Sequence, residues 1–146
     1  MVIIDPRDEY DGIIVNSFED FVDYIKDKDE FKIVCRYESD IDIDYTFKAI
    51  FVIKNILLVV EEAEIYISPL AKQSSFLTLV RYGRHKNIKI IGIARRASEL
   101  SIDFRAMTDK IISFKQTEIR DLDALEKLGF KNLNQLGEHE YQELTL

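Results

Sequence analysis

Short apolar runs alternate along the whole chain with segments in which apolar residues recur every three or four positions. Wholly apolar runs are typical of strands buried in a parallel sheet, and the longer period is typical of helices. Five runs predict strands: Val2–Ile4, Lys32–Tyr37, Ile56–Val60, Ile88–Ala94 and Lys110–Phe114. The alternation predicts an α/β fold with a three-layer, mainly parallel five-stranded sheet and helices on both faces.

Capping residues mark the ends of several predicted helices. Ser17 and Thr117 are suitable N-caps, and Gly83 and Gly129 follow the last periodic positions of two helices. Helices are predicted after Ser17 and over Asp44–Lys54, Ala71–Tyr82, Ser98–Arg105 and Ile119–Leu128. Asp40, Asp42 and Asp44 alternate with apolar residues, which hints at a calcium loop but favours a solvated edge strand, because an EF-hand needs a glycine and a final glutamate.

The length of the chain is sufficient for one domain. With 146 residues, 47% apolar and 32% charged, it has the composition of a globular protein with a real core. We expect a single α/β domain over residues 1–131 and a C-terminal tail over residues 132–146, with one helical turn followed by extended chain. Cys35 has no partner for an internal disulfide, and no apolar stretch is long enough to cross a membrane. A cytoplasmic location and no membrane partner are therefore expected.

Charge is distributed unevenly. The net charge is −7, yet residues 65–98 contain no acid. The bases of this region are Lys72, Arg81, Arg84, Lys86, Lys89, Arg95 and Arg96. An acidic protein is a poor general binder of nucleic acid, but a local basic surface could meet phosphates of a nucleotide or of DNA. On charge alone, a solvated basic helix end is the favoured interpretation.

Charged residues follow several of the predicted strands. In open parallel sheets, ligands bind at the carboxyl ends of the strands. This rule selects Asp5, Arg36, Glu61, Glu62, Ala94–Arg96 and Lys115. Two acids after a buried strand suit nucleotide hydrolysis, since the first can reach a magnesium ion and the second can orient or deprotonate water. Buried strands often end in acids for no catalytic reason, so the pair alone is a weak signal.

Four segments, in order, resemble the HerA/FtsK-type P-loop ATPases. Val2–Tyr10, with Asp-Pro and then Glu-Tyr, is similar to the segment after the family's phosphate-binding helix, and Ile56–Ala63 to its Walker B strand. Arg81–Ile88 with Ile90–Arg96 resembles the basic helix end and the sensor strand. Thr108–Phe114 with the following helix resembles the last core strand.

The resemblance implies roles for individual residues. Glu61 would be the magnesium ligand, where the family usually has Asp, and Glu62 the catalytic, water-activating residue. Arg95 takes the sensor position, where the family has Gln, and it could contact phosphate. Arg81 and Arg84 are candidates for arginines that act on a neighbouring subunit; the alternative is a basic turn that complements the helix dipole.

The phosphate-binding loop of the family is missing. None of the five glycines belongs to a Gly-x-x-x-x-Gly-Lys-Ser/Thr motif, which supplies most contacts to the nucleotide phosphates. The resemblance places the missing strand between the sensor strand and the last core strand. We therefore expect Ile88–Ile93 to pair directly with Lys110–Phe114, or a dimer to form across that gap.

Three hypotheses follow from these observations. The first is a degenerate or truncated ATPase-like domain of phage or mobile-element type, without ATP hydrolysis or cofactor on its own, that acts as an interaction module. The second is a portion of a DNA-translocating or packaging motor that hydrolyses ATP with Mg²⁺ once an upstream Walker A segment completes it. The third is an unrelated small α/β binding domain. A protein partner or homo-oligomer is expected, and DNA contact is possible through Arg84, Lys86 and Arg96.

Overall fold

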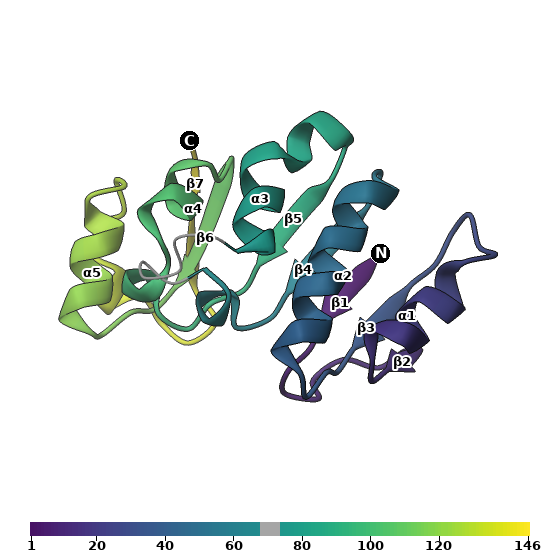
Figure 1. Ribbon diagram of the computed structural model, residues 1–146. Coiled ribbons are helices and arrows are strands. Elements are labelled where there is room, and N and C mark those ends of the chain that lie inside the picture. The colour runs from purple at the N-terminus through teal and green to yellow at the C-terminus, as the bar shows by residue number, and fades with distance from the viewer. Residues whose placement is uncertain (68–73) are drawn as a thin grey trace.

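A five-stranded parallel sheet forms the centre of the molecule. The computed structural model describes residues 1–67 and 74–146. The strand order is β2-β3-β1-β4-β5, and every neighbouring pair is parallel (Figure 1). The strands are β1 (Val2–Ile4), β2 (Ile14–Val15), β3 (Ile33–Cys35), β4 (Leu57–Val60) and β5 (Lys89–Gly92). The predicted α/β class and the parallel five-stranded sheet are confirmed.

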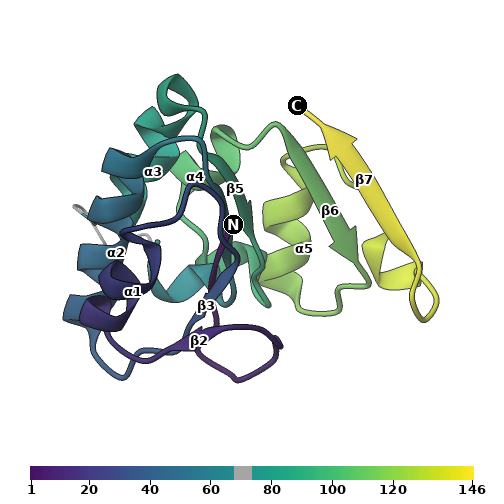
Figure 2. The same ribbon diagram turned by 90° about the vertical axis from the view of Figure 1, so that its right-hand side faces the viewer.

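Three helices cover one face of this sheet. They are α1 (Phe18–Ile25), α2 (Asp40–Ile53) and α3 (Ser75–Tyr82), which lie together on one side of the strands in Figure 2. Their buried side chains, including Phe21, Phe47 and Phe76, form the main core with the strands. On the other face, a small cluster of Ile3, Val34 and Val59 packs against Met1 and Tyr10. Within the described residues that cluster contains no helical residue, so the helices are distributed less evenly than expected.

Side-chain caps begin the helices of the main core. Ser17 accepts a hydrogen bond from the amide of Asp20, as its position predicts. Ser39 caps α2 through the amide of Ile41, so the helix already begins at Asp40. The edge-strand interpretation of the alternating aspartates is therefore wrong, and Asp40 and Asp42 instead complement the helix dipole in the first turn. Of the predicted helix Ala71–Tyr82, residues 71–73 lie outside the described residues.

The strand predicted at Lys110–Phe114 belongs to a second sheet. It forms β6 (Lys110–Phe114), which pairs antiparallel with β7 (Tyr141–Thr145), while the fifth strand of the main sheet is the two-residue β2. The expected direct pairing with β5 is therefore wrong. β6 pairs with β7 instead, across the cavity from β5. Phe104 packs against a face of β5, so close that a Cβ at Gly92 would be 2.7 Å from its ring. Dimerisation across the gap stays a prediction.

The C-terminal part has a core of its own. Leu125, Phe130 and Leu133 are buried there, packed against residues that include Ile111 and Leu144. It contains α4 (Ile102–Ala106), α5 (Ile119–Glu126) and the 3₁₀ turns η3 (Ala97–Glu99) and η4 (Leu133–Gln135). The predicted helix Ser98–Arg105 is thus a turn followed by a short helix. The predicted Thr117 cap is wrong as well, since Glu118 precedes α5 and makes no side-chain cap.

Two further 3₁₀ turns flank the strands of the main sheet. They are η1 (Ala63–Ile65), directly after β4, and η2 (Gly83–Lys86), directly before β5. Among the helices in residues 1–67 and 74–146, none combines the length and the apolar character needed to cross a membrane.

Candidate functional site

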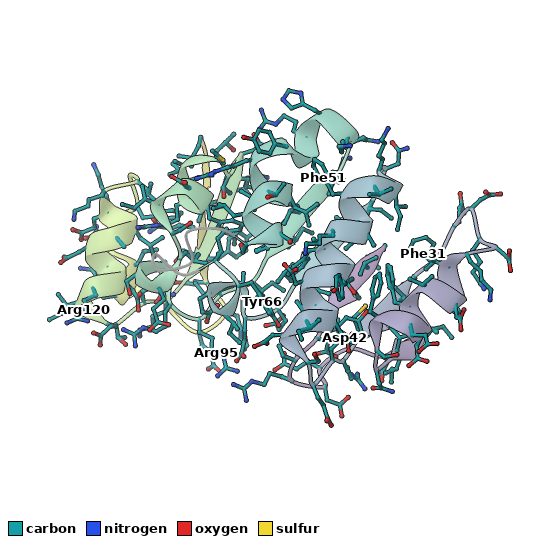
Figure 3. The ribbon with its side chains drawn as sticks, in the orientation of Figure 1. Phe31, Asp42, Phe51, Tyr66, Arg95 and Arg120 are labelled. Atoms are coloured by element: carbon teal, nitrogen blue, oxygen red, sulfur yellow. The ribbon has the colours of Figure 1, made fainter. Side chains whose placement is uncertain are left out.

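Most of the selected charged residues meet at the carboxyl edge of the sheet. Asp5 follows β1, Arg36 follows β3, the two glutamates follow β4, and Arg95 follows β5. In Figure 3 Arg95 lies on the lower side of the molecule, the side on which α2 begins. The parallel topology therefore gathers these residues as the strand rule predicts.

Asp5 organises the loop that follows β1. Its buried carboxylate accepts hydrogen bonds from the amides of Glu9 and Tyr10, at 3.0 and 3.1 Å, and from Nε of Arg36 at 3.0 Å. Burial alone would raise the pKa of Asp5, but these hydrogen bonds outweigh it and hold the pKa below its ordinary value. These contacts occupy the carboxylate of Asp5, so this residue stabilises the site and is not free to bind a ligand.

Glu61 lies beside the ring of Tyr10. The Tyr10 hydroxyl donates to Oε2 of Glu61 at 3.0 Å. Burial is the main cause that raises the pKa of Glu61, and the nearby carboxylates of Glu9 and Asp5 add to it. Burial likewise raises the pKa of Tyr10 to about 12, so the phenol stays protonated and keeps donating at neutral pH. The Glu61 carboxylate is thus oriented by a neutral donor.

Glu62 is held by two arginines. Its backbone is left-handed, with φ 49° and ψ 49°, and the side chain is only 6% exposed. Nε of Arg7 lies 3.0 Å from both carboxylate oxygens, and Nη2 of Arg95 lies 2.8 Å from Oε1. Two backbone bonds fix this arrangement, because Ile93 donates to Val60 and Ala63 donates to Ile93, each at 2.9 Å. The two predicted residues Glu62 and Arg95 are therefore in direct contact.

Arg7 is a site residue that the strand rule does not find. It lies three residues beyond the end of β1, in the turn that contains Pro6, and not directly after a strand. The only sequence signal is a base within a short loop that already holds a selected acid. Its ion pair with Glu62, 55 positions away, arises only when β1 and β4 become neighbours in the sheet.

The other predicted bases lie elsewhere. Arg81 and Arg84 precede β5 in the chain. They form ion pairs with Asp103 and Asp109, respectively, which follow it. Arg96 follows β5 but turns to the C-terminal part, where Nε contacts the buried Asp121 at 2.9 Å. Of the three DNA candidates, Arg84 and Lys86 precede β5 and Arg96 follows it, and contact with DNA stays a prediction.

A cavity separates β5 from β6. It has a volume of about 150 Å³, and its lining includes Gly92 and Arg95 from one side and Ile112 and Phe114 from the other. Ile112 and Phe114, which belong to this lining, are each about half exposed. Within the described residues β5 pairs only with β4, so its second edge has free backbone groups.

The donor set at the edge suits magnesium only together with a ligand. Among the described residues, no three His, Cys, Asp or Glu side chains are grouped to hold a metal. Magnesium, however, is usually bound through one or two carboxylates plus substrate phosphates. Glu61 is compatible with that mode, whereas a cage made by the protein alone is not available there.

Comparison with solved structures finds the same fold in viral packaging proteins. The chain aligns with the genome-packaging NTPase B204 of Sulfolobus turreted icosahedral virus 2 in complex with sulfate at a TM-score of 0.80 and 18% identity, covering 99% of this chain and 74% of that one. For the complex with AMP the TM-score is 0.75 and the identity 18%, and the alignment covers 99% of this chain and 76% of that one. The DNA-packaging ATPase B204 of Sulfolobus turreted icosahedral virus aligns at a TM-score of 0.79 and 15% identity, covering 99% of this chain and 76% of that one. These values show that the chain shares the fold of these packaging proteins. No protein-family model and no curated protein matches the chain.

Proposed function

We propose that this chain is the Walker B and sensor part of a HerA/FtsK-type motor that translocates or packages DNA. ATP hydrolysis would require a phosphate-binding loop, which these 146 residues do not contain. The observation that carries the proposal is the contact between Glu62, after β4, and Arg95, after β5, at the carboxyl edge. This is the edge at which α/β sheets bind nucleotides, and the fold is shared with B204.

Each residue has a defined task in this proposal. Glu61, oriented by Tyr10, would hold the magnesium ion, whose chemistry is to neutralise charge on the phosphates. Glu62 would orient the attacking water and accept its proton, which requires that its carboxylate leave the two arginines. Arg95 would then donate to a phosphate oxygen, because a guanidinium binds phosphate through several N–H groups.

The gap between β5 and β6 provides a place for the missing segment. Among the described residues the second edge of β5 is free, the cavity beside it is partly apolar, and Ile112 and Phe114 of its lining are about half exposed. A parallel strand added to β5 would satisfy this backbone edge and cover apolar surface. The loop that follows such a strand would then lie at the carboxyl edge, next to Glu62 and Arg95.

Calorimetric titration of Mg-ATP tests this proposal. The chain alone should show no binding at millimolar nucleotide, since it lacks the phosphate cradle. The chain completed with a strand, a phosphate-binding loop and a helix should bind at micromolar concentration. A completed chain in which the loop lysine is replaced by alanine is the matched control. Equal affinity of the chain with and without the added segment would contradict the proposal.

A second candidate function is an interaction module with no turnover. Glu62 is nearly buried and ion-paired to Arg7 and Arg95, an arrangement that also suits a purely structural cluster. In that case the free edge of β5 would bind a protein partner and the carboxyl edge would bind nothing. The same titration separates the two functions, because the completed module would still not bind Mg-ATP.

A further inference from the structure

We propose that Arg7 and Arg95 form an oxyanion site that Glu62 occupies until a phosphate displaces it. This inference rests on the proposed function, because it takes the displacing ligand to be the terminal phosphates of a nucleotide. It adds Arg7 to the site and gives Glu62 a second task, because its carboxylate competes with the ligand for the two arginines.

The first argument is the difference in exposure between the partners. The Glu62 side chain is 6% exposed, whereas those of Arg7 and Arg95 are 56% and 64% exposed. A pair of guanidiniums that served only to neutralise a buried acid would be expected to share its burial. Here the acid lies inside and both bases keep most of their surface toward solvent, so a ligand can approach the arginines directly.

The second argument is the number of free donors. A guanidinium has five N–H groups, and these contacts use Nε of Arg7 and Nη2 of Arg95. Among the described residues no other hydrogen bond or ion pair of these two side chains is present. Both arginines therefore keep donors that a phosphate, with more acceptor oxygens than a carboxylate, can use at the same time.

The third argument is the way in which Glu62 reaches the arginines. The left-handed backbone of Glu62 is strained for a non-glycine residue and persists because its surroundings enforce it. Here Glu61 donates its amide to Ile4, and Ala63 donates to Ile93, so both neighbours of Glu62 are fixed. The side chain is directed toward the arginines by the backbone, and rotation of its own torsions is enough to release it.

Removal of the competitor gives the decisive test. Pyrophosphate without metal should bind the unmodified chain only at millimolar concentration. Glu62→Gln should bind it at least about tenfold more tightly, because charge-assisted hydrogen bonds of the arginines become available to the ligand. Arg7→Gln in the Glu62→Gln background should abolish that gain. If Glu62 were only structural or only a catalytic base, its replacement would not raise the affinity.

Controls separate this site from general electrostatics. Glu9→Gln removes one negative charge from the same edge, at an exposed position, and should change the affinity for pyrophosphate less than twofold. An equal gain for Glu9→Gln and Glu62→Gln, or no gain for Glu62→Gln, would overturn the inference. The Nε–H resonances of Arg7 and Arg95 should shift when pyrophosphate is added, which also tests the site without any substitution. Unchanged resonances at saturation would overturn it.

The source of the phosphate is tested by competition. ATP should displace pyrophosphate from Glu62→Gln, while a DNA duplex at equal phosphate concentration should not. Displacement by DNA alone would overturn the assignment to a nucleotide. None of these measurements depends on turnover or on the added segment, so a failure here is distinguishable from a failure of the proposed function. A completed chain that binds Mg-ATP independently of Arg7 would reject this inference and retain that function.

Discussion

Asp5 and Glu62 both follow buried strands of the same sheet, yet their surroundings give them different tasks. Asp5 accepts bonds from two loop amides and from Arg36, which leaves it no capacity for a ligand. Glu62 is paired only to side chains that can move, and those side chains are exposed. Both residues are carboxylic acids that follow a buried strand within two positions, so their partners are what distinguish a structural acid from a functional one.

Replacement of Asp5 should reveal its structural task. Asp5→Asn should lower the free energy of unfolding at pH 7 by about 2–3 kcal/mol, because one amide oxygen cannot replace the carboxylate toward its three donors. The pKa of Asp5 is lowered in the folded state, so its stabilisation is present above pH 4 or so and is lost as the pH falls through the folded value. The variant should therefore lose less stability between pH 5 and pH 2, as urea titration measures.

The exposed Asp29 provides the control for this prediction. Asp29→Asn should leave the stability at pH 7 unchanged, since the side chain is exposed. Asp121, whose pKa is also lowered, through Ser98 and Arg96, should account for much of the remaining acid sensitivity. Equal stability of Asp5→Asn and Asp29→Asn at pH 7 would contradict the role given to Asp5.

At the scale of elements, the sequence pattern was most informative where burial is complete. β1, β3 and β4 are apolar on both faces and were found from their runs. β2 has only two residues, too few for any period, and β6 pairs with β7 outside the main sheet. Pairing partners depend on tertiary packing, which a local pattern does not contain. The same limit explains why Arg7 was missed while Arg95 was found.

Packing of α4 against β5 can be tested at Gly92. A Cβ there would lie 2.7 Å from the Phe104 ring and 3.3 Å from the Ala63 side chain. Gly92→Ala should therefore cost about 1–3 kcal/mol, although alanine is normally better than glycine in a strand. Phe104→Leu should reduce that cost, and a double-mutant cycle with urea unfolding measures the coupling. Additive effects of the two substitutions would show that α4 does not pack on β5 in this way.

At the scale of the whole molecule, the main sheet and the β6–β7 sheet stand on either side of a cavity. The sensor-like Arg95 and Gly92 of β5 line this cavity, and within the described residues β5 has no strand partner on that side. The overall α/β class was predictable because alternating periods are a property of the entire chain. The gap between β5 and β6 was not predictable, because the identity of a residue does not indicate whether a neighbouring strand is present.

The central claim is that Glu62 becomes a catalytic residue when a phosphate-binding segment completes the carboxyl edge. ATP turnover by the completed chain tests this most directly, with Glu99→Gln, an exposed glutamate in η3, as the matched control. The account predicts turnover that falls by about 10²–10⁴-fold in Glu62→Gln and is unchanged in Glu99→Gln. Turnover at the unmodified rate in Glu62→Gln would contradict it.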